Sequence, residues 1–184
     1  LQGYDAGQAG KQLVENVPIT TWGVNYALAV DGISVALILM TTFVGILAIA
    51  GAWEVIQYKP HQFMAALLIL EGLLIGVFCA TDALLFYALF EAILIPMFVI
   101  IGAWGGPRRV YATLKFFIYT FVGSVFMLIA LLWLYQQTHT FDLDTLAALP
   151  LTFEQQTWVF FGFLIAFAIK VPMVPVHTWL PDAH

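Results

Sequence analysis

Five long apolar stretches constrain the fold of this 184-residue chain more than any other feature. A helix that crosses the hydrocarbon core of a bilayer needs about 20 mostly apolar residues. Stretches of this kind occupy residues 33–53, 62–81, 83–104, 116–135 and 158–176. The first and the fourth contain no charged residue, so they lack the polar face of a helix in a soluble protein. The sequence therefore predicts an all-α integral membrane chain with about five transmembrane helices.

The composition agrees with lipid as the solvent. Hydrophobic residues make up 62% of the chain and charged residues 9%, against roughly 25% charged residues in a soluble domain. The net charge of −5 leaves no basic surface for nucleic acid. The single cysteine, Cys79, cannot form an internal disulfide and cannot hold a metal or an iron–sulfur cluster by itself. We therefore expect no cofactor, no metal and no nucleic acid on this chain.

The positions of lysine and arginine predict the orientation of the helices, because cytoplasmic loops carry an excess of both. If residues 1–32 lie outside, the outer segments contain only Lys11, whereas the inner ones contain Lys59, Arg108, Arg109 and Lys115. We therefore expect residues 1–32 to form a loop on the outer, periplasmic side and residues 33–184 to form the transmembrane part. Residues 136–157 read as a polar loop with one turn of surface helix. The abrupt beginning and end of the chain suggest a fragment of a longer membrane protein.

Three ionisable side chains lie inside the predicted spans. A charge at the centre of a membrane helix costs at least about 2.5–3.5 kcal/mol, so such residues usually face a partner or water. At about 1.5 Å per residue from the outer end of each span, Glu91, Glu71 and Lys170 lie about 12, 15 and 18 Å deep. Pairing with the lysine favours charged carboxylates, whereas desolvation favours neutral groups. These opposed effects suit a proton relay; the alternative is a static ion pair that only fixes helix packing.

Prolines lie next to two of these ionisable residues. Pro172 and Pro175 follow Lys170, and Pro96 follows Glu91 by five positions. Because proline has no N–H group, each one leaves a helix carbonyl without its usual donor. Irregular backbone at membrane depth occurs only where protein or a hydrated cavity satisfies it. We therefore expect the last span to be discontinuous at Lys170, with an ordinary proline kink as the alternative.

Three further residues near the inner end are candidate relay groups: Lys115, His177 and His184. An imidazole gains and loses a proton near neutral pH, which suits a proton carrier. Lys115 could equally extend along the span to keep its charge in water. The two histidines and Asp182 are a weak metal motif, and we predict no metal site.

Three segments carry a resemblance to a known family: LLFYALFEAILIPMFVIIGAWGG (84–106), RRVYATLKFFIYTFVGS (108–124) and FAIKVPMVPVHTWLPDAH (167–184). In order and spacing they resemble the antiporter-like subunit M of proton-pumping NADH–quinone oxidoreductase, respiratory complex I, which mitochondria call chain 4. The similarity extends from about residue 26 to the end of the chain. The HTWLPDAH segment alone also fits subunits of multisubunit cation/proton antiporters, which is the alternative interpretation.

The resemblance implies an antiporter-like helical bundle and a role for individual residues. Glu91 and Lys170 match the coupled acid–base pair of the family's proton channel, the groups that carry out proton transfer. Lys115, His177 and His184 match residues of the family motifs. Glu71 has no counterpart in that pattern, so its candidate role rests on its depth alone.

The resemblance also implies a function, a location and partners. It points to a proton-translocating subunit of an H⁺-translocating NADH:quinone reductase, in the bacterial inner (plasma) membrane, beside other membrane subunits and lipid. NADH, FMN, iron–sulfur clusters and quinone would belong to other subunits, so no redox chemistry is expected in this chain. The family is much longer than this chain, which is expected to hold at most the input half of a channel.

Overall fold

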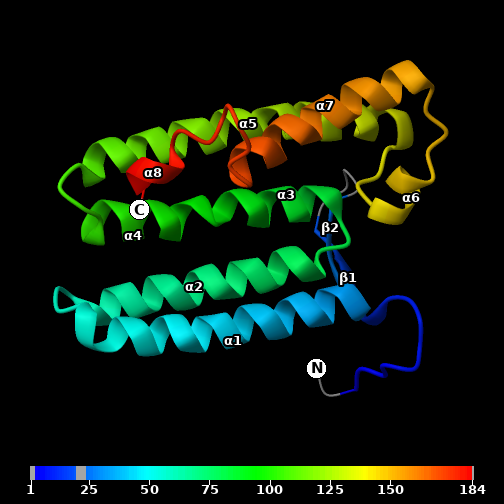
Figure 1. Cartoon of the computed structure of the whole chain (residues 1–184). Coiled ribbons are helices and arrows are strands. Elements are labelled where there is room, and N and C mark those ends of the chain that lie inside the picture. Colours follow the sequence, from blue (N-terminus) through cyan, green and yellow to red (C-terminus); the bar gives the residue numbers. More distant parts are fainter. Residues whose placement is uncertain (1–2, 20–23, 184) are drawn as a thin grey trace.

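The structure, a computed structural model, describes residues 3–19 and 24–183. Helices lie side by side along most of their length, with a short β-hairpin at one end (Figure 1). The hairpin consists of β1 (Gln12–Pro18) and β2 (Asn25–Val30). The helices are α1 (Gly32–Val55), α2 (Pro60–Cys79), α3 (Ala83–Ala92), α4 (Leu94–Trp104), α5 (Arg109–Thr138), α6 (Leu143–Ala147), α7 (Phe153–Lys170) and α8 (Leu180–Ala183).

Local signals in the sequence set the beginnings of these helices. The Asp31 side chain accepts a hydrogen bond from the Ser34 N–H at 2.8 Å and caps α1. Pro60 occupies the first position of α2, where a missing N–H costs nothing. Thr152 and Gln155 form a reciprocal capping box at the start of α7. These three helices therefore begin at residues that satisfy or remove a free backbone donor.

The predicted all-α membrane fold is confirmed. In the described part of the chain, four helical segments are long and apolar enough to cross a membrane: α1, α2, α3 with α4, and α5. The span predicted at 116–135 begins earlier, at Arg109, because the charged side chains in its first turns do not interrupt the helix.

The fifth predicted span differs from residues 158–176. The helix α7 begins at Phe153 and ends at Lys170, and it is not among the four spanning segments. Its first turn is polar, with Glu154 and Gln155, and Pro172 stops the helix because the residue before a proline disfavours the helical conformation. The expected discontinuity of the last span is thus present, immediately after Lys170.

A second break divides the third span. The helix is interrupted at Ile93, between α3 and α4, three residues before Pro96. Pro96 cannot donate to the carbonyl of Ala92, so the ladder of hydrogen bonds loses one member directly after Glu91. Both ionisable residues predicted to lie beside loosened turns therefore do so.

The β-hairpin falls in the segment that the sequence predicts to be an outer loop. β1 and β2 pair antiparallel, and the turn between α2 and α3 packs on β2. The Thr81 N–H donates to the Ala27 carbonyl at 3.0 Å, and the Leu143 N–H donates to the Thr81 carbonyl at 3.0 Å. Asp82, 1% exposed, accepts from the Leu84 and Leu85 N–H groups and caps α3. These bonds fix one end of the bundle; α6 is the single surface helix expected within residues 136–157.

The helices are arranged in layers, with α2 between α1 and the α3–α4 pair, and with α5 and α7 on the other side of that pair (Figure 1). One buried cluster, near the hairpin end, includes Met127, Leu131 and Phe141. A second one, near α8, includes Phe116, Ile169 and Trp179. The long helix α5 contributes to both clusters, so it is the common support of the bundle.

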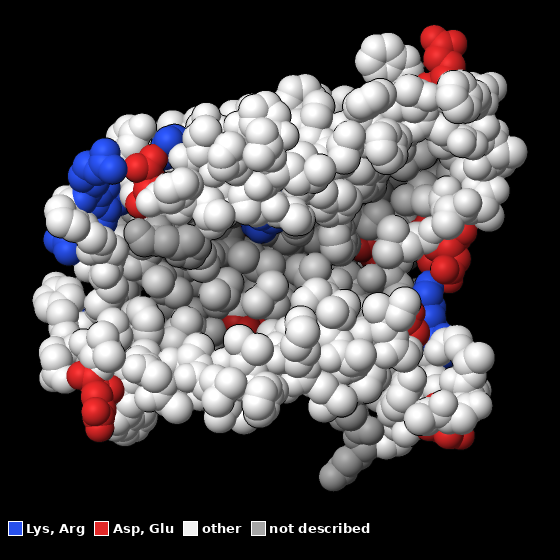
Figure 2. All heavy atoms as spheres, viewed as in Figure 1, with Lys and Arg blue, Asp and Glu red and all other residues white. Residues whose placement is uncertain are grey.

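The outer faces of the helices are apolar. Large side chains such as Phe43 and Trp53 of α1 are exposed at 63% and 71%. Figure 2 shows charged groups mainly at the two ends of the helices, with small recessed patches of each sign in the middle. Most of the blue surface lies at the end of the α1–α2 and α4–α5 connections. This separation fits the predicted orientation, although the sides of the membrane themselves stay a prediction.

Candidate functional site

The candidate site begins with Lys170, the last residue of α7. The Val171 N–H still donates to the Phe167 carbonyl at 2.8 Å, but the chain then leaves the helix. The Met173 N–H reaches back to the Ala168 carbonyl at 2.7 Å, so this carbonyl, which Pro172 cannot serve, finds another donor. The break therefore places Lys170 at the junction between α7 and the irregular segment that follows it.

The Lys170 ammonium contacts the last turn of α3. Its Nζ lies 4.4 Å from the centroid of the Phe90 ring and donates a long hydrogen bond, 3.5 Å, to the Phe90 carbonyl. A cation over the face of an aromatic ring is attracted by the electron density of the ring. Phe90 itself is 8% exposed and also packs edge-on against Phe167 of α7. The contact thus holds the lysine one residue away from Glu91.

Glu91 lies at the adjoining position, and its carboxyl group is incompletely satisfied. Among the described residues no hydrogen bond or ion pair reaches its buried Oε1 atom. Ser124 of α5 lies beside this carboxyl group, although the Ser124 hydroxyl donates to the Phe121 carbonyl at 2.8 Å. The structure brings Glu91 and Lys170 to the same region without a direct ion pair, so their coupling stays a prediction.

The helices carrying this site approach closely at a glycine. A Cβ atom placed on Gly123 of α5 would stand 2.7 Å from the Cδ1 of Ile169, the residue before Lys170. Small residues allow this approach between membrane helices. The close contact at Gly123 fixes the distance of the α7 terminus from α5.

The segment after the break folds back onto α5. The Trp179 indole N–H donates to the Ile169 carbonyl at 2.9 Å, and the Thr178 hydroxyl donates to the Tyr119 hydroxyl at 3.0 Å. At the end of the segment, Asp182 forms ion pairs with Lys115 at 2.8 Å and with Arg108 at 3.3 Å. Lys115 is therefore paired with an acid at the inner end, rather than extended freely into solvent or joined to Lys170.

Glu71 lies in a different interface from the other candidates. Its carboxyl group packs against the backbone of Gly45 on α1. On the same helix, Gly76 faces Leu89 of α3, and residues five apart on a helix are about 140° apart around its axis. Glu71 thus faces away from α3 and Glu91, and the structure does not bring it into the Lys170 cluster.

The histidines give less information. His177 lies in the folded-back segment, and its buried Nδ1 has no hydrogen-bond partner within the described ranges. His184 lies outside the described residues. In the part of the chain that the structure describes, no group of three or more His, Cys, Asp or Glu side chains could hold a metal ion.

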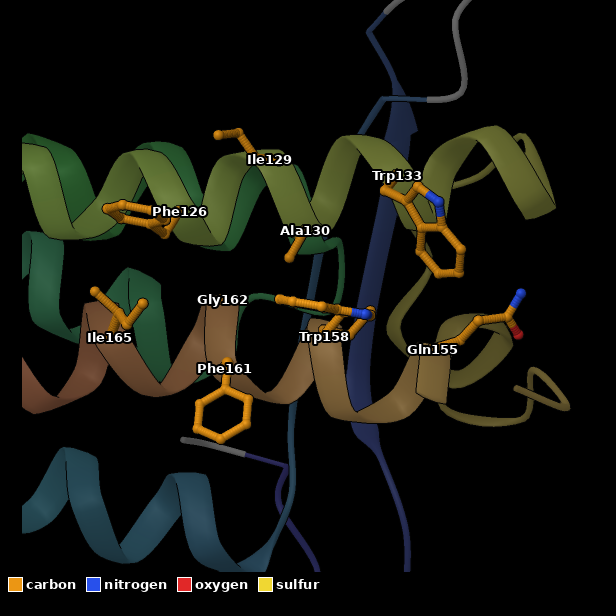
Figure 3. Close-up of a pocket in the computed structure, with 10 residues that line it drawn as sticks. Phe126, Ile129, Ala130, Trp133, Gln155, Trp158, Phe161, Gly162 and Ile165 are labelled. Atoms are coloured by element: carbon orange, nitrogen blue, oxygen red, sulfur yellow. The ribbon is translucent and has the colours of Figure 1, made fainter. Parts of the chain in front are cut away.

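An apolar pocket of about 480 Å³ between α5 and α7 is separate from this site (Figure 3). Its lining contains no titratable side chain. The residues are Phe126, Ile129, Ala130 and Trp133 of α5 and Gln155, Trp158, Val159, Phe161, Gly162 and Ile165 of α7.

Three residues of the site were not predicted as such from the sequence: Phe90, Trp179 and, as an ion-pair partner, Asp182. Phe90 directly precedes Glu91, the one acidic residue of the predicted span 83–104. Its place beside the candidate acid could therefore have been predicted from the sequence. The partners of Trp179 and Asp182 depend on how the chain folds back after Pro172, and no local pattern specifies that return.

A membrane bundle with a half-buried acid and a half-buried base beside two broken helices is typical of ion-transporting membrane proteins. The sequence model of the family described as "NADH:quinone oxidoreductase/Mrp antiporter, TM" matches residues 80–184. The chain belongs to this family.

Similar proteins support this membership across the whole chain. Subunit M of NADH-quinone oxidoreductase from Rhodobacter capsulatus is 49% identical over 100% of this chain and 38% of its own length. Chain 4 of NADH-ubiquinone oxidoreductase from Arabidopsis thaliana is 43% identical over 98% of this chain and 37% of its own length. This chain therefore spans less than half the length of the relatives that it matches.

Solved structures show the same fold. A chain of respiratory complex I from Thermus thermophilus with bound NADH superposes with a TM-score of 0.84 and 39% identity, covering 97% of this chain and 38% of that chain. A chain of the membrane-bound sulfane sulfur reductase, an archaeal respiratory membrane complex, gives a TM-score of 0.75 and 27% identity, covering 92% and 28%. The fold thus occurs in more than one respiratory membrane complex.

Proposed function

We propose that this chain is part of the proton-translocating membrane subunit of an NADH:quinone oxidoreductase, with Glu91 and Lys170 as the groups that transfer the proton. The observation that carries the proposal is the end of α7 at Lys170, whose ammonium reaches the Phe90 carbonyl directly beside Glu91. The names of the relatives from Rhodobacter capsulatus and Arabidopsis thaliana support the same function.

The proposed step moves one proton between the two side chains. The Lys170 ammonium releases a proton, directly or through a water molecule, and the Glu91 carboxylate accepts it, so two charged groups become two neutral ones. Because burial disfavours charge, a small change in their separation or in a neighbouring charge shifts this balance. In a membrane subunit, that sensitivity is what couples proton movement to an event elsewhere in the complex.

The family also supports a proposal for the location and the partners of the chain. The protein would lie in the bacterial inner membrane, in contact with lipid and with other membrane subunits of the complex. NADH oxidation and quinone reduction would take place in other subunits with FMN and iron–sulfur clusters, since a single cysteine cannot hold a cluster here. Because the chain spans 38% of its relative from Rhodobacter capsulatus, it would supply at most the input half of a proton path.

The test uses the full-length subunit in the assembled complex. Glu91→Gln and Lys170→Ala should each lower both proton pumping and the coupled NADH:quinone reductase rate, because each removes one member of the pair. Glu154→Gln is the matched control, since it removes an exposed carboxylate from the first turn of α7. Unchanged pumping in both site variants would show that the proposal is wrong.

A subunit of a multisubunit cation/proton antiporter is the second candidate, because the family description also includes Mrp antiporters. It would use the same acid and base without a redox partner. Sodium-stimulated antiport without NADH oxidation would favour it, whereas neighbouring genes for nucleotide-binding and iron–sulfur subunits would exclude it. If the pair served only to hold helices together, the variants would lose assembly while the surviving complex kept its normal turnover.

A further inference from the structure

A second ionic cluster lies at the inner end of the bundle, on the folded-back segment. The Asp182 carboxylate bridges Lys115 of α5 at 2.8 Å and Arg108, the residue before α5, at 3.3 Å. Lys115 and Asp182 keep only 19% and 16% of their side chains exposed. The hydrogen bond that Lys115 donates lowers the pKa of the Asp182 carboxyl group below its ordinary value, so this group is charged at neutral pH.

The cluster differs from the other Lys–Asp ion pair that the described residues contain. Lys11 and Asp144 pair near the opposite end of the bundle with side chains 36% and 73% exposed. Exposed pairs contribute about 0–1 kcal/mol and are screened by salt. A partly buried pair that joins two segments is costly to break, because the remaining charge loses its partner. The Lys115–Asp182 pair is therefore the stronger constraint of the two.

Trp179 connects the folded-back segment to the last turn of α7. Trp179, three residues before Asp182, is 7% exposed, and its ring lies 5.1 Å from that of Phe116 on α5. Its indole N–H donates to the Ile169 carbonyl at 2.9 Å. Ile169 adjoins Lys170, so a movement of the segment at Trp179 acts on the last turn of α7.

The two ionic sites lie at different heights along α5. Ile169 packs on Gly123, which is eight residues beyond Lys115 in the same helix. At about 1.5 Å per residue, this separation is about 12 Å. The Asp182 cluster is thus too far away to exchange a proton directly with Lys170, and its influence must pass through the folded-back segment.

We propose that Asp182 is a positioning residue: its ion pairs with Lys115 and Arg108 clamp residues 171–183 onto α5, and Trp179 transmits this clamp to the α7 terminus that holds Lys170. The inference rests on the proposed function of Lys170, which it extends. It assigns Lys115 a role as the anchor of the clamp instead of a member of the proton relay. Loss of the clamp lets the Lys170 side chain leave its place over Phe90.

The first test measures proton pumping in the full complex. Asp182→Asn should lower it about tenfold or more, since a displacement of about 1 Å at a reacting group costs on the order of 100-fold. Asp182→Glu keeps the charge and should restore most of the rate, as should the exchanged pair Asp182→Lys with Lys115→Asp. A rate near that of the unmodified complex for Asp182→Asn, or no recovery in either charge-restoring variant, would overturn the proposal.

Asp144→Asn is the matched control, because it makes the same chemical change in the exposed Lys11–Asp144 pair. It should leave pumping unchanged. An equal loss in Asp144→Asn and Asp182→Asn would mean that the effect does not come from the clamp.

A second measurement detects the clamp without any reference to activity. Val176, partly buried against the cluster around Trp179, is changed to cysteine in a Cys79→Ser background. Maleimide labelling of this cysteine should become about tenfold faster when Asp182→Asn is added, as expected for a segment whose closed state loses a net interaction of about 1.4 kcal/mol. An unchanged labelling rate would contradict the clamp.

Lys170→Ala separates this inference from the proposed function. If Lys170→Ala abolishes pumping while Asp182→Asn has no effect, the proposed function stands and the positioning role fails. If Lys170→Ala leaves pumping intact while Asp182→Asn speeds the labelling of Val176→Cys, the proposed function fails and the clamp survives only as a structural feature.

Discussion

Ile169 packs directly on Gly123, so close that a Cβ atom on this glycine would stand 2.7 Å from the Ile169 Cδ1 and 3.3 Å from its Cβ. Ile169 is the residue before Lys170, where α7 ends. The position of the proposed proton-transfer lysine therefore depends on the absence of a side chain on the neighbouring helix α5.

Gly123→Ala should destabilise the subunit by about 1–3 kcal/mol, because an added methyl group in a well-packed interface forces its neighbours apart. It should also lower proton pumping, since α7 must move together with Lys170. Thermal unfolding and pumping of the full complex measure the two effects. Gly51→Ala on α1 is the control: apart from the adjoining residues and backbone of its own helix, nothing lies within 4 Å of its added Cβ, and this change should be neutral or slightly stabilising.

Phe90→Leu should weaken the contact that holds the Lys170 ammonium over the Phe90 ring. The substitution keeps an apolar side chain but removes the ring under the ammonium, an interaction of roughly 0.5–2 kcal/mol. We expect proton pumping to fall several-fold, in line with this energy. Phe98→Leu is the control, because Phe98 pairs with the Phe117 ring and lies in no cation–ring contact among those of the described residues. Equal pumping in both variants would contradict a role for the ring.

The sequence specifies where the helices break but not how they face one another. Pro172 and Pro96 act through the covalent structure of proline, so the breaks beside Lys170 and Glu91 could be predicted from position alone. Which side chain then meets the Lys170 ammonium depends on the rotation of α3 against α7. The contact with Phe90, one residue from the expected partner, is a result of that packing.

The estimated depth of a residue in the membrane predicted its neighbours less well than the side of the helix on which it lies. The estimated depth of Glu71 lies between those of Glu91 and Lys170, but Glu71 is on the side of α2 that faces α1. Spacing within one helix cannot show which neighbour occupies each side. The hairpin of β1 and β2 was missed for a related reason, since Ala27 and Thr81, which join it to the helices, are far apart in the sequence.

Gly45→Ala should destabilise the α1–α2 interface, because the new methyl group would overlap the Glu71 carboxyl group. Overpacking of this kind costs about 1–3 kcal/mol. The double variant Gly45→Ala with Glu71→Ala should recover much of this loss, since it removes the group that clashes. A double-mutant cycle on the melting temperature of the full-length subunit measures this coupling. Strictly additive effects would show that Glu71 does not occupy the space beside Gly45.

The protection of α6 against hydrogen exchange should fall at low pH, because protonation of the Asp142 carboxylate weakens the cap of this helix. Its side chain caps α6 by accepting from the Thr145 N–H at 2.9 Å and from the Thr145 hydroxyl at 2.7 Å. Mainly because of the hydroxyl bond, the pKa of the Asp142 carboxyl group lies below its ordinary value of 3.8. A lowered folded-state pKa contributes stability that is fully present above the ordinary value and is lost as the pH falls through the folded value.

The protection factor of the Thr145 amide, measured from about pH 5 downwards, should therefore decrease in the unmodified chain. It should vary much less with pH in Asp142→Asn, because asparagine keeps a capping oxygen but does not titrate. Thr145→Val removes the main cause of the lowered pKa, so the loss of protection should begin at a higher pH in that variant. The same pH dependence in all three chains would rule out Asp142 as the titrating cap.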